Sequence, residues 1–176
     1  MDNVNQQENL DLLQQLVRGT EMGKNTLEQM LPLTEDRLLR AELLEEQRGY
    51  RTLNQKAHTA VAALGKQAEG AGTLEKLGAK LGVTSRLLGD RSTKKLAEMM
   101  VEGTNMGITE CVQAQNRNPG ASAGAKKLAD EVLAFQRAKF EDAENRYAWK
   151  IRRAYGGGFV KKGMELARQR QEEADV

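Results

Sequence analysis

The chain has 176 residues, of which 39% are hydrophobic and 4% aromatic, and its formal net charge is +2. This length suits a single domain with its own core, and so small a charge excludes any argument for nucleic-acid or membrane binding from net charge alone. The single cysteine excludes an internal disulfide, the polar start MDNVNQQENL has no secretory pattern, and no apolar run suits a membrane span. We therefore expect a soluble, cytoplasmic protein.

Two amphipathic helices are predicted in the first part of the chain. Apolar residues recur at three- and four-residue spacing from about 8 to 31 and again from about 34 to 68. Pro32 separates the two helices, and Thr34 is a favourable N-cap for the second. The glycine-containing segment 69–72 is expected to end the second helix.

A short amphipathic helix is predicted over 74–88, and a second pair of long helices follows it. Asp90 or Ser92 is then expected to open a helix over about 93–116, because both side chains are good N-caps. The turn NRNPGASAG follows this helix. No strand pattern is present in the sequence, so the fold class is predicted to be all-α.

The last predicted long helix runs from about 124 to 155 and is ended by three consecutive glycines. A short final helix from Phe159 is compatible with the pattern. The glycines suggest a division into a helical bundle over 1–155 and a hinged C-terminal tail over 156–176.

The sequence carries a repeat. GTEMG at 19–23 is echoed by GTNMG at 103–107, and LLEEQR at 43–48 is echoed more weakly by VLAFQR at 132–137. A short helix, a tight turn and a long helix therefore occur twice, which favours a duplicated helical hairpin packed against itself.

The connection between the two hairpins is long. A simple up-and-down bundle joins neighbouring helices through a few residues. Here the connection contains the predicted helix 74–88, which covers about 22 Å, and with its flanking loops it can traverse the ~36 Å length of the first helix. The third long helix is therefore expected to be antiparallel to the first, with 74–88 as a crossover helix.

The repeat places two glycines in the middle of each short helix. Each internal glycine costs about 0.8–1 kcal/mol relative to alanine, so a gain elsewhere must offset them. If the two helices are antiparallel, their midpoints face each other. Close backbone approach, with methionines filling the flanking space, is the favoured interpretation, and a small ligand pocket is the alternative. The helix-packing residues would be Gly19, Met22, Gly23, Gly103, Met106 and Gly107.

These motifs support a family resemblance. GTEMG together with DRSTKKLAEMMVEGTNMGITE at 90–110 resembles an uncharacterised bacterial family of ferritin-like helical proteins. The resemblance covers roughly 8–145, is most specific over 90–107, and excludes the tail. It implies a ferritin-like four-helix bundle of two hairpins joined by a crossover helix, and it supplies no activity.

The metal chemistry of the ferritin-like superfamily is not predicted for this chain. A di-metal site needs a Glu-x-x-His motif on each of two helices, but the one histidine, His58, follows Gln55 by three residues. No metal, cofactor or catalytic residue is therefore predicted. The alternative is a carboxylate-only metal site, whose candidates are Glu21, Glu46, Glu102 and Glu131.

Two further residues receive structural interpretations. His58 is expected on a helix surface without a role, and Cys111, which has no nearby partner in sequence, is expected to be a small buried apolar residue.

The C-terminal region interleaves aromatic and basic side chains. Packing of the aromatics on the end of the second helix is one interpretation, protein docking or self-association is another, and binding to nucleic acid or an anionic membrane is a third. The candidate docking residues are Trp149, Arg152, Arg153, Tyr155 and Phe159.

The favoured functional hypothesis is a non-catalytic structural or protein-interaction bundle that self-associates or docks on a partner. The alternatives are a degenerate metal-binding bundle and a nucleic-acid or membrane-surface binder.

Overall fold

The structure is a computed structural model that describes residues 2–70, 72, 82, 85–87, 89–143 and 145–146. Its helices are α1 (Asp2–Met30), α2 (Arg37–Ala63), α4 (Thr93–Arg117) and a helix over residues 123–143, with a 3₁₀ turn, η1 (Leu31–Leu33), after α1. The described residues contain no strand, which confirms the all-α prediction. None of the described helices is long and apolar enough to cross a membrane.

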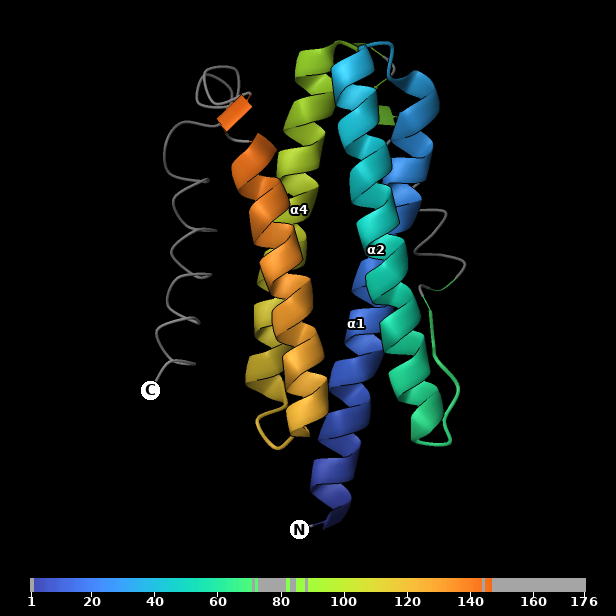
Figure 1. Ribbon diagram of the computed structural model, residues 1–176, viewed down its shortest axis with the longest axis vertical. Helices are drawn as coiled ribbons and strands as arrows, with labels where there is room; N and C mark the ends of the chain where they lie inside the picture. Colours follow the sequence, from blue (N-terminus) through green and yellow to red (C-terminus); the bar gives the residue numbers. More distant parts are fainter. Residues whose placement is uncertain are drawn as a thin grey trace.

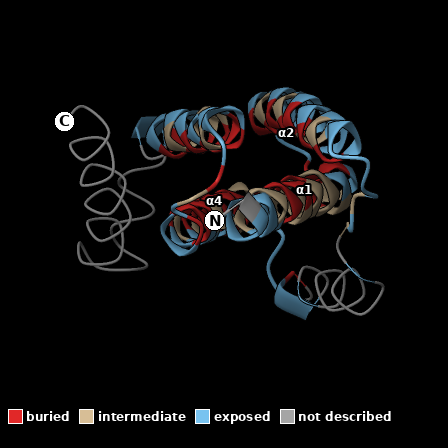
Figure 2. Ribbon diagram, turned by 90° about the horizontal axis from the view of Figure 1, so that it is seen from below, coloured by how far each residue is buried: buried red, intermediate tan, exposed pale blue. Residues whose placement is uncertain are grey.

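The four long helices form two layers of two. α1 and α4 lie in one layer, and α2 and the 123–143 helix lie in the other, with their buried faces turned toward each other (Figure 2). Along the chain, α1 rises, α2 and α4 both descend, and the 123–143 helix rises again (Figure 1). The connection from α2 to α4 therefore spans the bundle. Most of the predicted crossover helix 74–88 lies outside the described residues.

Hydrogen bonds at one end of the bundle fix the relative direction of α1 and α4. The first turns of α1 meet the turn that follows α4, where the Gly120 N–H donates to Glu8 and the Ser122 hydroxyl donates to Asn9 Oδ1 at 2.7 Å. The start of α1 thus lies at the end of α4, so the two helices are antiparallel, as predicted (Figure 1).

The start of α2 differs from the prediction. Asp36 is the N-cap, and its carboxylate accepts a hydrogen bond from the Leu39 N–H at 2.9 Å. Thr34, the predicted cap, instead donates its hydroxyl proton to the Met30 carbonyl oxygen at 2.8 Å, because Pro32 continues the chain into the 3₁₀ turn η1.

The other helix ends follow local signals. α2 ends at Ala63, five residues before the predicted end, because Gly65 adopts a left-handed φ of 68° that stops the helix. α4 begins as predicted, with Ser92 accepting a hydrogen bond from the Lys95 N–H at 3.2 Å. α1 begins six residues earlier than predicted, since no proline or glycine interrupts residues 2–7.

Removal of the α2 cap is expected to have a measurable cost. Asp36→Ala leaves the Leu39 N–H without its side-chain acceptor and should lower the free energy of unfolding by about 1 kcal/mol in urea titrations. Glu35→Ala, one residue away and exposed, is the matched control and should change stability by less than about 0.5 kcal/mol. Equal losses in the two variants would contradict the assignment of Asp36 as the cap.

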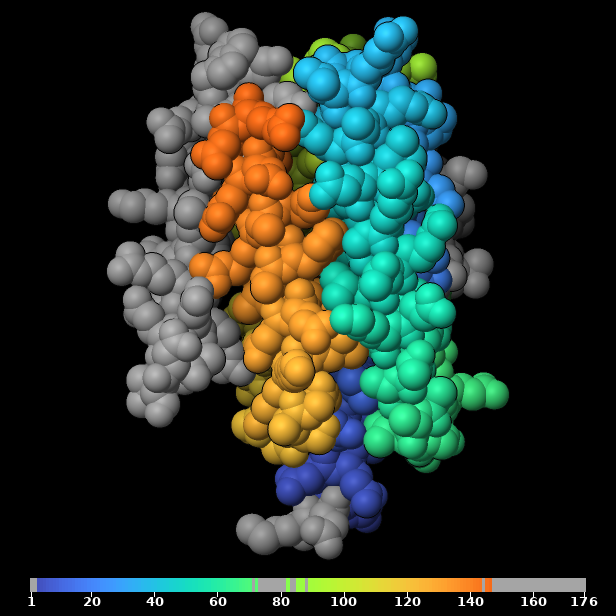
Figure 3. Space-filling model, viewed as in Figure 1, coloured from blue at the N-terminus to red at the C-terminus, as the bar shows by residue number. Residues whose placement is uncertain are grey.

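α2 and the 123–143 helix pack side by side over the length of one face (Figure 3). The Phe135 ring lies against Gly49, where a Cβ would overlap it, and meets the Tyr50 ring edge-on with centroids 5.1 Å apart. Ion pairs bridge the two helices at the surface, such as Lys139 to Glu45 at 2.6 Å. This interface holds Tyr50 in a fixed position beneath the α1–α4 layer. The largest fully buried side chains of the core include Leu12, Val17, Met30, Leu39, Leu43, Leu96 and Ile108.

Candidate functional site

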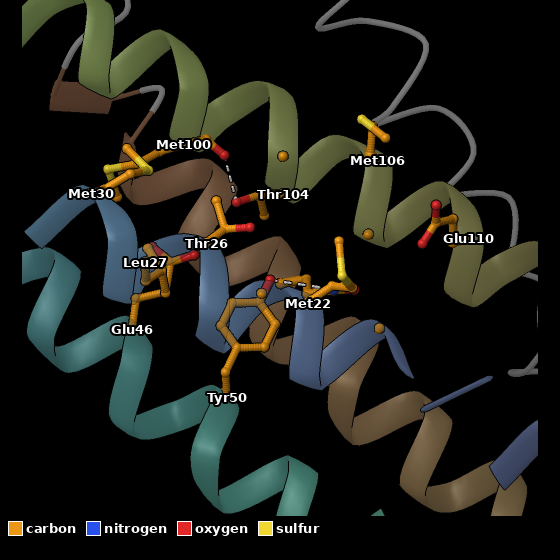
Figure 4. A pocket seen from close by; sticks show the side chains of 15 residues that line it. Met22, Thr26, Leu27, Met30, Glu46, Tyr50, Met100, Thr104, Met106 and Glu110 are labelled. Carbon is orange, nitrogen blue, oxygen red and sulfur yellow. Dashed lines mark hydrogen bonds between the residues drawn. The ribbon is translucent and has the colours of Figure 1, made fainter. Parts of the chain in front are cut away.

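The two copies of the repeated motif face one pocket. The pocket has a volume of about 220 Å³ and lies between the middles of α1 and α4 (Figure 4). Residues 19–23 of α1 and 103–107 of α4 contribute both glycines and the methionine of each copy to its lining. The antiparallel arrangement of α1 and α4 therefore brings the repeat together at one place.

Equivalent residues of the two copies make equivalent contacts. Thr20 and Thr104 are both buried, and each donates its hydroxyl proton to the carbonyl oxygen four residues earlier, at 2.6 Å and 2.8 Å. Each threonine is thereby satisfied within its own helix. With the threonine of each motif on the core side, the two glycines of the motif lie beside the pocket.

The second glycine of each copy makes room for a side chain from the other layer. A Cβ on Gly23 would lie 2.6 Å from the Tyr50 ring, and a Cβ on Gly107 would overlap the Gln136 amide. Tyr50 comes from α2 and Gln136 from the 123–143 helix. These glycines therefore allow two polar side chains from the other layer to reach the pocket.

The first glycine of each copy has a different environment. A Cβ on Gly19 or Gly103 would meet no atom of the described chain within 4 Å. The missing side chains at these two positions therefore leave open space. Met106, predicted to fill the packed interface, is 55% exposed at the pocket's edge. Open space at Gly19 and Gly103 favours the pocket interpretation, whereas Gly23 and Gly107 allow close packing.

The inner wall of the pocket is polar. Glu46, Tyr50 and Gln136 are all at least 97% buried, with exposed fractions of 3%, 3% and 2%. The Gln136 amide nitrogen donates to the Tyr50 hydroxyl at 3.4 Å, and burial raises the pKa of Tyr50. Burial also raises the pKa of Glu46 to about 7, although nearby Lys139 and a hydrogen bond to Thr104 act in the opposite direction.

Apart from the glycines, Thr26, Thr104 and Glu110, the remaining lining side chains are apolar, and most of them are methionines. Met22 and Tyr50 extend toward the space between α1 and α4, and Met106 lies across from Met22 (Figure 4). Four methionines line the pocket, which gives polarizable walls that adapt to irregular shapes. The apolar lining consists of Met22, Leu27, Met30, Met100 and Met106.

The candidate carboxylate metal site does not form within the described residues. No group of three His, Cys, Asp or Glu side chains there could hold a metal ion. Glu131 instead bonds Lys56 at 2.7 Å, which lowers the pKa of Glu131, and Glu102 pairs with Arg86. Of the four candidates, Glu46 alone is buried and lines the pocket.

The two residues given structural interpretations lie as expected. His58 is exposed on α2. Cys111 is buried, and its thiol donates to the Ala129 carbonyl oxygen at 3.5 Å.

The predicted docking residues of the tail lie outside the described residues, as do the glycine hinge 156–158 and the short helix predicted from Phe159. They are Trp149, Arg152, Arg153, Tyr155 and Phe159. The docking role of these residues therefore stays a prediction from the sequence.

Sequence reasoning missed Gln136 and named Glu46 only as a candidate metal ligand, although the spacing carried a signal that both are buried. Glu46 lies between Leu43 and Tyr50 at core spacing on α2, and Gln136 lies four residues after Val132 on its helix. A polar residue at a core position of an apolar stripe is a candidate for a functional role, because its burial without a partner is costly.

Comparisons with protein-family models, curated proteins and solved structures found no match to this chain.

Proposed function

We propose that this protein is a non-catalytic binding bundle of ferritin-like topology that holds a small molecule at mid-height between α1 and α4. The observation that carries the proposal is the pocket of about 220 Å³ built by both copies of the repeated motif. Apolar walls with a few convergent polar groups are typical of small-molecule sites.

The cost of the first glycines supports a binding role. Alanine at Gly19 or Gly103 would meet nothing in the described chain within 4 Å, and it would favour the helix by about 1 kcal/mol. Packing within the described chain therefore gives no reason for glycine at these two positions. Stability given up for open volume is a common feature of functional sites.

The ferritin-like, duplicated-hairpin assignment also remains a proposal. The order of helix directions and the matching contacts of Thr20 and Thr104 support it. A non-catalytic role is proposed because the superfamily's Glu-x-x-His pair is absent from the sequence.

Self-association or protein docking through the tail, in a cytoplasmic protein, stands beside this proposal as a sequence-based hypothesis. Sedimentation of the full chain against a chain truncated at Gly156 tests the docking hypothesis. A smaller assembly after truncation would favour it, and identical monomers would count against it.

Entry of a small molecule can be tested with toluene as the probe. In ¹³C-methyl methionine spectra of the full chain, toluene should shift Met22, Met30 and Met100. Met99, which is buried but does not line the pocket, is the internal control. Gly103→Leu places a side chain in the open space and should weaken toluene binding at least tenfold.

Thr59→Leu, exposed on α2, is the matched control variant and should bind toluene as the wild type does. The binding proposal fails if toluene leaves the pocket methionines unchanged, or if Gly103→Leu and Thr59→Leu bind it equally.

A further inference from the structure

The inner wall of the pocket offers a hydrogen-bond acceptor that the described chain does not use. Gln136 Oε1 is buried and has no hydrogen-bond partner among the described residues. The amide nitrogen of the same side chain is directed to the Tyr50 hydroxyl. A buried acceptor left unpaired costs free energy, so a ligand that donates a hydrogen bond at this place gains from satisfying it.

Glu46 adds a second acceptor on the same wall. Thr104 bonds Glu46, but the single proton of its hydroxyl is directed to the Met100 carbonyl oxygen at 2.8 Å. That hydroxyl is therefore shared between the Met100 carbonyl oxygen and Glu46, and its bond to Glu46 lowers the pKa of the carboxyl group. Burial outweighs this bond and the attraction of Lys139, and it raises the pKa of Glu46 to about 7.

The charged groups around Glu46 do not provide a direct counterion. Lys139 faces it from the 123–143 helix and lowers its pKa, whereas Glu42 and Glu45 on α2 raise it. The Lys139 ammonium is bonded to Glu45 at 2.6 Å. Among the described residues that line the pocket there are two glutamates and no lysine, arginine or histidine. The pocket therefore favours a cation over an anion.

The size and the walls define the rest of the ligand. A volume of about 220 Å³ exceeds the roughly 150 Å³ of an engineered apolar cavity that holds benzene. One ring with a short polar arm fits this space. Thioether sulfurs contact aromatic rings favourably, so the methionine walls suit a ring.

We propose that the pocket binds a small protonated primary amine with an apolar body of about one ring, its ammonium group directed to Glu46 and Gln136. This inference rests on the proposed binding function. Below pH 7 the binding of an ammonium group releases the Glu46 proton to solvent, so affinity rises with pH until Glu46 is ionised.

Four ring compounds of similar size separate the contributions of charge and hydrogen bonding. Calorimetric titrations of the full chain with benzylamine, benzyl alcohol, toluene and benzoate are compared at pH 6 and pH 8. Benzylamine should bind at least tenfold more tightly than benzyl alcohol at pH 8. Its affinity should fall roughly tenfold at pH 6, because an acid of pKa near 7 is about nine-tenths protonated there. Toluene should show no pH dependence, and benzoate should bind most weakly.

Glu46→Gln should remove both the preference for benzylamine and its pH dependence while leaving toluene binding intact. Glu131→Gln, at a surface carboxylate paired with Lys56, is the matched control and should keep both. Equal affinities for benzylamine and benzyl alcohol at pH 8, or an unchanged pH profile in Glu46→Gln, would overturn the amine assignment while the binding function stands. If none of the four compounds binds, the binding function itself fails.

Discussion

Glu46→Gln should be more stable than the wild type at pH 8 by roughly 3 kcal/mol. Burial raises the pKa of Glu46 from its ordinary value of 4.5 to about 7 in the folded protein. The folded state therefore holds this proton more tightly than the unfolded chain does. As pH rises from about 4.5 to about 7, the unfolded chain ionises first, and the free energy of unfolding falls. Glutamine keeps the shape of the protonated side chain without this loss.

Urea unfolding of both proteins from pH 4 to pH 8 measures the effect. The difference between Glu46→Gln and wild type should be small at pH 4, grow through the interval, and level off above pH 7. In Glu131 the bond to Lys56 lowers the pKa, so its stabilising contribution is lost only as pH falls, and Glu131→Gln should give no gain at pH 8. Parallel pH profiles for Glu46→Gln and wild type would show that Glu46 ionises normally.

Two identical substitutions one helical turn apart on α1 should have opposite effects. Gly19→Ala should raise the free energy of unfolding by up to about 1 kcal/mol, since the new methyl meets open space. Gly23→Ala should lower it by about 1–3 kcal/mol. There the methyl would lie 2.6 Å from the Tyr50 ring. Tyr50 cannot easily retreat, because it is buried and its ring meets Phe135.

The second copy of the motif provides an internal repeat of this experiment on α4. Gly103→Ala should behave as Gly19→Ala does, and Gly107→Ala should be destabilising because its methyl would overlap the buried Gln136 amide. Thermal or urea unfolding of the four variants is sufficient. If Gly19→Ala or Gly103→Ala is instead destabilising, these glycines lie in a packed interface and the space beside them is not open.

The helices themselves could be predicted from the sequence because their signals are local. The predicted helix 93–116 is observed as Thr93–Arg117, since Ser92 and the apolar spacing act within a few residues. Where two local signals competed, at the start of α2, the predicted N-cap was wrong. Thr34 and Asp36 are both good caps, and the choice between them depended on how Pro32 directed the chain.

The antiparallel arrangement of α1 and α4 could also be predicted, because the length of the connection limits where α4 can begin. The repeated motif then indicated which residues would face each other. Both predictions used only chain length and sequence order, which are available without coordinates.

What the glycines do could not be predicted in this way. The sequence shows four glycines at mid-helix, but the contact each one makes depends on side chains from distant parts of the chain. Tyr50 and Gln136 fill the space beside Gly23 and Gly107, and nothing in the described chain fills it beside Gly19 and Gly103. Composition and spacing therefore specified the helices and their order. The packing distances between helices, which arise from residues far apart in sequence, made the difference between a closed interface and a pocket.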